Sequence, residues 1–317
     1  MSEPLAQRVA SATPPQLAHR IRGLSDRTIA WLFVAPTIFL LLAINIFPLI
    51  WTIRLSLTNF RTNKPNAEVE FVGLENYRKI LTDEDTWIAL QSTAHFLIWT
   101  IVLQVLIGFT LAYLINKKFR GNDLWTTLIV LPMMLSPAVV GNFWTFLYQP
   151  QIGLFNYFIA FLTGADPASF SMIGDVPLAP WAIVIVDTWM WTPFMTLMTL
   201  AALGSVPKAE LEAAQVDRLP ITRLIRTVIW PHAKFILGLG ILLRTIDAFK
   251  TMDLAYVMTG GGPGDRTELI AVSLYRFAFK SFKLGYSSAV SVFLMFIAIA
   301  LTSIYLYILN ARKKAEA

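Results

Sequence analysis

Apolar stretches long enough to cross a membrane recur along this chain. A transmembrane helix needs about 20 predominantly apolar residues, and the sequence offers them at 29–51, 88–115, 124–147, 180–203, 235–258 and 285–309. In lipid, each backbone N–H and C=O needs an internal partner, so stretches of this kind fold as helices. The sequence therefore predicts an all-α integral membrane protein with six transmembrane helices.

The composition agrees with this fold class and excludes several others. Of the 317 residues, 56% are hydrophobic and 15% are charged, whereas soluble domains have about 25% charged residues. The chain has no cysteine and three histidines, which excludes a disulfide scaffold and disfavours a metal site. The net charge of +6 is better explained by basic loops beside anionic lipid than by nucleic acid. The lipid bilayer is the expected environment.

The distribution of basic residues predicts the orientation. The N-terminal tail, the loops 116–123 and 204–234 and the C-terminal tail hold fifteen of the 26 Lys and Arg residues, and the loop 149–179 holds none. Because cytoplasmic loops are enriched in Lys and Arg, both termini are expected in the cytoplasm of a bacterial plasma (inner) membrane protein. We expect residues 1–28 to be a mostly disordered cytoplasmic tail, 29–311 one transmembrane domain and 312–317 a second tail.

The cytoplasmic loop 204–234 has the composition of a helix. Acidic residues lie toward its start and Arg223 and Arg226 follow, which suits the dipole of a helix beginning near Pro207. Pro220 separates a second helical segment, which Pro231 is expected to end. This pattern predicts a short helix across the cytoplasmic mouth that presents a surface to a partner. The alternative is an ordinary interfacial helix.

The same loop carries a recognisable motif. Glu212-Ala213-Ala214, then Asp217, then Pro231 nineteen residues after the Glu, resembles the EAA loop of ABC importer permeases. Further motifs follow in the order expected for the carbohydrate-type branch, which includes maltose, trehalose and glycerol-phosphate permeases. They lie at 71–77, 191–194, 203–207, 259–263 and 282–289.

This resemblance implies one permease subunit of an ATP-driven importer, which is not an enzyme itself. No GxxxxGK[ST] motif occurs in the chain, so ATP is expected on a partner subunit and no cofactor on this one. The implied partners are a second homologous permease, two ATP-binding cassette ATPase subunits and an extracytoplasmic solute-binding protein. Coupling to the ATPases is expected to involve Glu212, Ala213, Ala214, Asp217, Arg218 and Pro231, with Glu212 capping the start of the loop helix.

One position departs from the family pattern. Arg218 replaces the glycine that follows the motif's Asp, and Leu219-Pro220 comes next. Glycine permits a positive φ angle, which arginine adopts only at a cost. The geometry of the loop is therefore in question, and Arg218 is either a contact to the ATPase or a solvated side chain.

Two predicted spans carry charges at membrane depth, where charges are costly and usually face a polar interior. In each span, four residues at i, i+3, i+4 and i+7 share one face; they are Asp187, Met190, Trp191 and Phe194, and Arg244, Asp247, Ala248 and Thr251. An aromatic ring beside planar charged groups suits a sugar, and the resemblance implies sugar binding between these helices. The alternative is a structural ion pair of Arg244 with Asp187 or Asp247.

Three other interpretations remain open. Arg244 and Lys250 would favour an anionic solute, but Asp247 and Asp253 offset them. A secondary transporter driven by an ion gradient would use Asp187, Asp247 and His95 as coupling groups, although no inverted repeat is evident. The run 259–263 is glycine-rich but lacks the lysine of a phosphate-binding loop, so we expect a tight extracytoplasmic turn.

Overall fold

The computed structural model describes residues 25–63, 69–117 and 119–315. Most of the two expected tails, residues 1–24 and 316–317, lies outside them. Within these ranges the chain is helical apart from its connections and one isolated antiparallel bridge between Thr58 and Phe71. It divides into two compact units, 1–51 and 52–317, which are described separately.

Helices make up most of the described backbone. The first unit holds most of α1 (Asp26–Ser56). The longest helices of the second unit are α3 (Glu84–Ile115), α7 (Ala179–Gly204), α10 (Trp230–Phe249) and α13 (Leu284–Ala315). Its shorter helices are α2 (Glu75–Thr82), α4 (Asn122–Val130), α5 (Pro137–Leu147), α6 (Leu154–Thr163), α8 (Lys208–Val216), α9 (Ile221–Leu224), α11 (Asp253–Thr259) and α12 (Ile270–Tyr275).

The membrane-protein fold class is confirmed, with one change in the third predicted span. In the described residues, five helices are long and apolar enough to cross a membrane, and a bent pair makes a sixth if it counts as one span. That pair is 122–134 and α5, which meet at 98°. The span predicted over 124–147 is a broken one rather than a continuous helix, because Pro132 and Pro137 flank the break. Proline lacks the N–H that a continuous helix needs and its ring clashes with the preceding turn.

The fifth span begins and ends earlier than predicted. A helix runs from Ile221 to Phe249, and α11 follows as a separate element, so 235–258 is not one helix. Pro231 does not end the preceding segment as expected. Residues Ile225–Ile229 form a π-helical turn directly before it, and this wider turn accommodates a ring that would clash in a regular α-helix.

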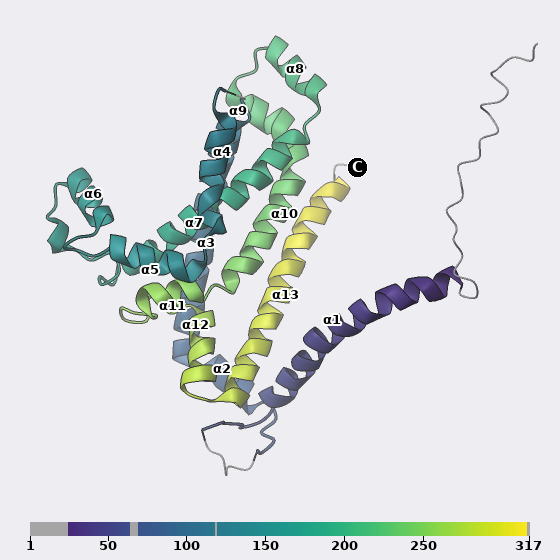
Figure 1. Cartoon of the computed structure of the whole chain (residues 1–317), viewed down its shortest axis with the longest axis vertical. Helices are drawn as coiled ribbons and strands as arrows, with labels where there is room; N and C mark the ends of the chain where they lie inside the picture. Colours follow the sequence, from purple (N-terminus) through teal and green to yellow (C-terminus); the bar gives the residue numbers. More distant parts are fainter. Residues whose placement is uncertain (1–24, 64–68, 118, 316–317) are drawn as a thin grey trace, which may run out of the picture. The chain divides into compact units, whose positions relative to one another are not determined.

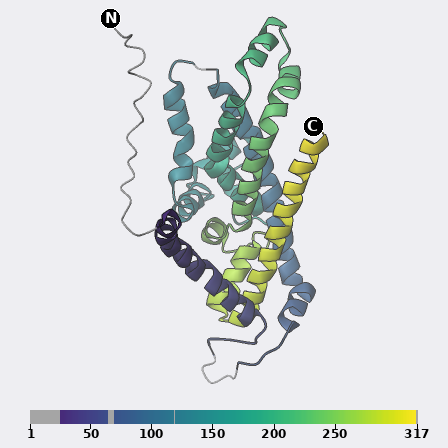
Figure 2. The same cartoon turned by 90° about the vertical axis from the view of Figure 1, so that its right-hand side faces the viewer.

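The centre of the second unit is the contact between α3 and α7. Gly108 of α3 lies so close to α7 that a Cβ atom there would come within 2.9 Å of Met195 Cβ and 3.0 Å of the Thr196 backbone nitrogen. A small residue lets the backbones of two helices approach closely. In a membrane this close packing holds helices together, because lipid supplies no hydrophobic driving force. In Figure 1, α8 lies at one end of this bundle and α2 and α12 lie toward the other. Figure 2 shows α10 and α13 running along each other.

We predict that Gly108→Val lowers the thermal unfolding midpoint of the full-length chain in detergent. Overpacking at a tight contact lowers the free energy of unfolding by about 1–3 kcal/mol. The atoms opposite Gly108 belong to the backbone or are Cβ atoms, so they cannot move aside as a flexible side chain could. Gly204→Ala is the matched control, because no heavy atom lies within 4 Å of an added Cβ there. Equal midpoints for the two variants would contradict this account of the α3–α7 contact.

Candidate functional site

A buried arginine joins three of the long helices. Arg244 of α10 is 1% exposed, and its guanidinium forms an ion pair with Asp187 of α7, which is equally buried. Its Nη1 donates to Asp247 Oδ2 at 2.8 Å, one turn further along α10. Both pairings that the sequence left open are therefore present together. One cation is shared by two carboxylates.

The third partner of Arg244 comes from a residue that sequence reasoning missed. Arg244 Nε donates to Gln104 Oε1 of α3 at 3.0 Å, and Gln104 Nε2 donates to Asp187 Oδ2 at 3.0 Å. Gln104 is fully buried. A glutamine at membrane depth was the available signal, because a buried amide requires partners. The network therefore ties α3, α7 and α10 together.

A cavity of about 250 Å³ opens beside this network. Five of the eight predicted solute-site residues line it, and Arg244 is sealed behind them. The five are Asp187, Met190, Trp191, Asp247 and Thr251. The centre of the Trp191 ring lies 5.0 Å from the guanidinium carbon of Arg244, so the ring is held by a cation–π contact. Lys250 and Asp253 add further charges to the wall.

The remaining predicted residues lie elsewhere. Phe194 does not line the cavity, and Ala248 is buried in the apolar core. His95 packs edge-on against Trp181 with ring centres 5.1 Å apart and lines a different cavity with Gln91 and Arg266. The structure therefore does not place His95 beside Asp187 and Asp247, as a common ion-coupling site would require.

The loop with the EAA pattern forms the expected short helix, α8, which begins directly after Pro207. Its surface is exposed at Glu212, Ala213 and Asp217, whereas Ala214 is buried. Glu212 lies in the second turn and caps nothing, because the helix starts at Lys208; Glu210 occupies the first turn instead. Glu210 Oε2 lies 2.9 Å from Nε2 of His232 in α10, which fastens α8 to the helix that carries Arg244.

The end of α8 explains why the family pattern has glycine where this chain has Arg218. Arg218 has a φ of 49°, in the left-handed region. The backbone N–H of Leu219 reaches back to the Ala214 carbonyl at 3.0 Å, and that of Arg218 to Gln215 at 3.1 Å. These bonds form the helix-ending motif that usually places glycine at this position. The turn is preserved at the expense of backbone strain.

The run 259–263 forms a tight turn, as expected. Gly260 and Gly261 have φ angles of 59° and 96°, and Arg276 holds the turn by contacting the Gly260 carbonyl and Glu268. Burial raises the pKa of Glu268, against the opposing effects of Ser273 and Arg276. These contacts join the turn to the neighbouring residues 268–276 of the same chain, so they give the turn a structural role.

Comparison with known proteins identifies the family. Residues 104–315 match the family described as "Binding-protein-dependent transport system inner membrane component", which is more than half of the chain. The chain belongs to this family. It is a permease subunit of an ABC transporter, and the ATPase of such a system is a separate subunit.

Curated relatives and a solved structure agree with this assignment. A trehalose/maltose transport system permease of Thermococcus litoralis is 30% identical over 288 residues, or 91% of this permease and 96% of the relative. A trehalose transport system permease of Mycobacterium tuberculosis is 31% identical, with 96% and 95% covered. A chain of a bacterial alginate ABC transporter, crystallised with a pentasaccharide-bound periplasmic protein, superposes with a TM-score of 0.74 at 17% identity, covering 87% of this permease and 92% of that chain. This likeness shows the shared fold.

We predict that Arg218→Gly slows hydrogen exchange of the α8 amides, because it removes a left-handed strain of about 1–2 kcal/mol. Gln215→Gly is the matched control. It places glycine inside the same exposed helix, where it costs about 1 kcal/mol, and should speed exchange. Faster exchange in both variants would show that Arg218 makes a stabilising contact that outweighs its strain.

Proposed function

We propose that this permease imports a sugar that an extracytoplasmic binding protein delivers, with ATP hydrolysed by partner subunits. The observation that supports the proposal is the cavity beside Trp191, which pairs an aromatic ring with the carboxylates of Asp187 and Asp247. A ring packs on the C–H faces of a sugar, and carboxylates accept hydrogen bonds from its hydroxyls. The two relatives are permeases of trehalose/maltose and trehalose transport systems, which agrees with this chemistry.

The charges around the cavity favour a sugar without a negative charge. Arg244 donates to Gln104, Asp187 and Asp247 and is sealed from the cavity, so its guanidinium is engaged within the protein. Two of the three carboxylates of the wall are the partners of Arg244, and Lys250 supplies a second cation. The wall and the arginine behind it therefore hold three carboxylates and two cations, a net charge of −1. An anionic solute would therefore meet net repulsion in a medium where charges interact strongly. This charge balance argues against the anionic solute that Arg244 and Lys250 suggested in the sequence.

We also propose the rest of the transport cycle, with the family membership as its support. We assign the exposed face of α8, with Glu212, Ala213 and Asp217, to contact with an ATPase subunit, and we place Arg218 and Pro231 in the turns that position it. A second homologous permease completes the pathway, with two ATPases and a binding protein. We propose that both termini of the chain lie on the cytoplasmic side of the inner membrane, as the distribution of Lys and Arg predicts. ATP-driven closure of the ATPases moves α8 and so biases the permease between two conformations.

An ion-gradient mechanism is less well supported. It would use Asp187 and Asp247 as coupling groups, yet both are paired with Arg244, and the family depends on binding proteins. Asp187 is better explained as the counter-ion of a buried arginine.

The proposal predicts that Trp191→Ala impairs uptake of labelled trehalose or maltose by proteoliposomes that hold the complete transporter. Losing a stacking ring costs about 0.5–1.5 kcal/mol beyond its buried area, or roughly 2- to 10-fold in apparent affinity. Basal ATPase activity and assembly yield should persist, and Trp191→Phe should retain most of the uptake. Trehalose 6-phosphate, an anionic analogue of similar shape, should compete poorly with the neutral sugars.

Trp189→Ala is the matched control, because Trp189 lies on the same helix, is 40% exposed and does not line the cavity. Equal losses in the two tryptophan variants, or full uptake by Trp191→Ala, would exclude this cavity as the solute site. Strong competition by the phosphorylated sugar would refute the charge argument alone.

A further inference from the structure

A second polar cavity, of about 550 Å³, lies among α2, the start of α3 and the start of α13. Its residues belong to the end of the bundle that is remote from α8, as the positions of α2 and α13 in Figure 1 show. The transport function proposed above makes no use of it. Its walls come from segments more than 200 residues apart in the sequence, 59–61 and 277–286.

The walls of this cavity are fixed by backbone hydrogen bonds. Gly285 N donates to the Phe60 carbonyl at 2.9 Å, and Thr62 N donates to the Phe282 carbonyl at 3.2 Å. Asn76 of α2 secures the same loop by donating to the carbonyls of Ser56 and Thr58 at 2.9 and 2.8 Å. The cavity is therefore preformed rather than created by a ligand.

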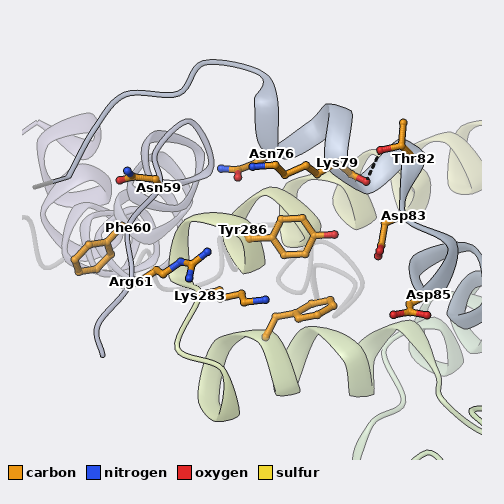
Figure 3. Close-up of a pocket in the computed structure, with 11 residues that line it drawn as sticks. Asn59, Phe60, Arg61, Asn76, Lys79, Thr82, Asp83, Asp85, Lys283 and Tyr286 are labelled. Carbon is orange, nitrogen blue, oxygen red and sulfur yellow. Dashed lines mark hydrogen bonds between the residues drawn. The ribbon is translucent and has the colours of Figure 1, made fainter. Parts of the chain in front are cut away.

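Charges of opposite sign lie at opposite sides of the cavity. Figure 3 shows Arg61 and Lys283 near each other, with Asp83 and Asp85 across the cavity and the Tyr286 ring between the two groups. Among the described residues, no ion pair includes Arg61 or Lys283. The third cation of the wall is already engaged: Lys79 Nζ lies 2.7 Å from Glu75 Oε1, and this contact lowers the pKa of Glu75.

The aromatic residues give the middle of the cavity an apolar surface. The rings of Tyr286 and Phe277 meet edge to face with centres 5.1 Å apart, and both line the cavity. A ligand that fits this arrangement has an anionic group, a short aliphatic link and a cationic group that can donate hydrogen bonds.

The position of the cavity indicates where such a ligand comes from. The membrane-spanning helices α3 and α13 begin at Glu84 and Leu284, so the cavity lies at the water–lipid boundary of two spans. Exposed apolar side chains occur in the same segments as the lining residues: Leu81 and Trp87 beside 82–85, and Phe279 and Phe282 just before Lys283. They are 55%, 46%, 65% and 44% exposed. Aromatic side chains at this level are typical of the headgroup region. A lipid is favoured over a water-soluble protein because its tails would cover this apolar rim.

We propose that the cavity binds the headgroup of phosphatidylethanolamine. Arg61 and Lys283 hold the phosphate, the rings of Tyr286 and Phe277 contact the ethylene link, and Asp83 and Asp85 accept hydrogen bonds from the primary ammonium. Asp83 Oδ2 already accepts from the backbone N–H of Thr86 at 3.2 Å and from the Thr86 hydroxyl, and the Tyr286 hydroxyl also contacts Asp83. Asp85 is therefore the main acceptor for the ammonium. Selectivity follows from chemistry: phosphatidylcholine has a quaternary ammonium without N–H donors, and phosphatidylglycerol has no cation.

The test is native mass spectrometry of the full-length permease, purified in mild detergent with whatever subunits remain bound and then incubated with equal amounts of the three lipids. Phosphatidylethanolamine should be retained roughly 5- to 10-fold better than the other two, as expected for charge-assisted hydrogen bonds. Lys283→Gln should reduce this retention by a similar factor. Asp85→Asn should abolish the preference over phosphatidylcholine while leaving phosphatidylcholine binding unchanged. Arg78→Gln, on α2 but outside the cavity wall, is the control and should behave like the wild type.

Equal retention of the three lipids, or variants that match the wild type, would overturn the proposal. Displacement of the lipid by an equal concentration of glycerophosphoethanolamine or inorganic phosphate would also overturn it, in favour of a site for soluble phosphates. If Lys283→Gln left lipid retention intact but abolished stimulation of ATP hydrolysis by the binding protein, the cavity would be a protein-docking site instead.

Discussion

The buried charge of Arg244 is the constraint on which the centre of this permease depends. An isolated cation in the low-dielectric interior of a membrane protein is strongly unfavourable, so it must be paired and fully hydrogen-bonded. Asp187, Asp247 and Gln104 supply those partners from three helices. Because removing any partner leaves a buried donor or acceptor of the network without a hydrogen bond, α3, α7 and α10 have one favourable arrangement at this depth. The Gly108 contact brings α3 close enough to α7 for Gln104 to reach the pair.

The same network links the two sites proposed to act in transport. Helix 221–249 runs from the loop that follows α8 to Arg244 at its far end. The Glu210–His232 contact fastens α8 near the other end of that helix. In the proposed mechanism, a displacement of α8 by an ATPase therefore has a continuous helical connection to the wall of the proposed solute cavity, through the π-helical turn before Pro231. Arg244 orders that wall while its hydrogen-bond donors are engaged within the protein.

The sequence predicted a feature correctly where one residue is energetically unfavourable in its local setting. Charges at membrane depth led to Asp187, Arg244 and Asp247, and the missing glycine led to the unusual backbone of Arg218. Other features depend on tertiary structure. The bend near Pro132 and the continuation through Pro231 were missed because a proline ends, kinks or permits a helix according to its surroundings. Gln104 was missed because its partners lie 83 and 140 residues away, and the cavity with Arg61 and Lys283 because it joins distant segments.

The most direct test of the central claim is a double-mutant cycle on Asp187 and Arg244, read as the thermal unfolding midpoint and assembly yield of the complete transporter. Asp187→Asn and Arg244→Gln should each be strongly destabilising, since breaking a buried ion pair from one side costs about 3–5 kcal/mol. The double variant should be more stable than the sum of the two losses predicts, by at least about 1 kcal/mol, because no unpaired charge remains between the two positions. Additive losses, or single variants as stable as the wild type, would show that this pair does not organise the helices.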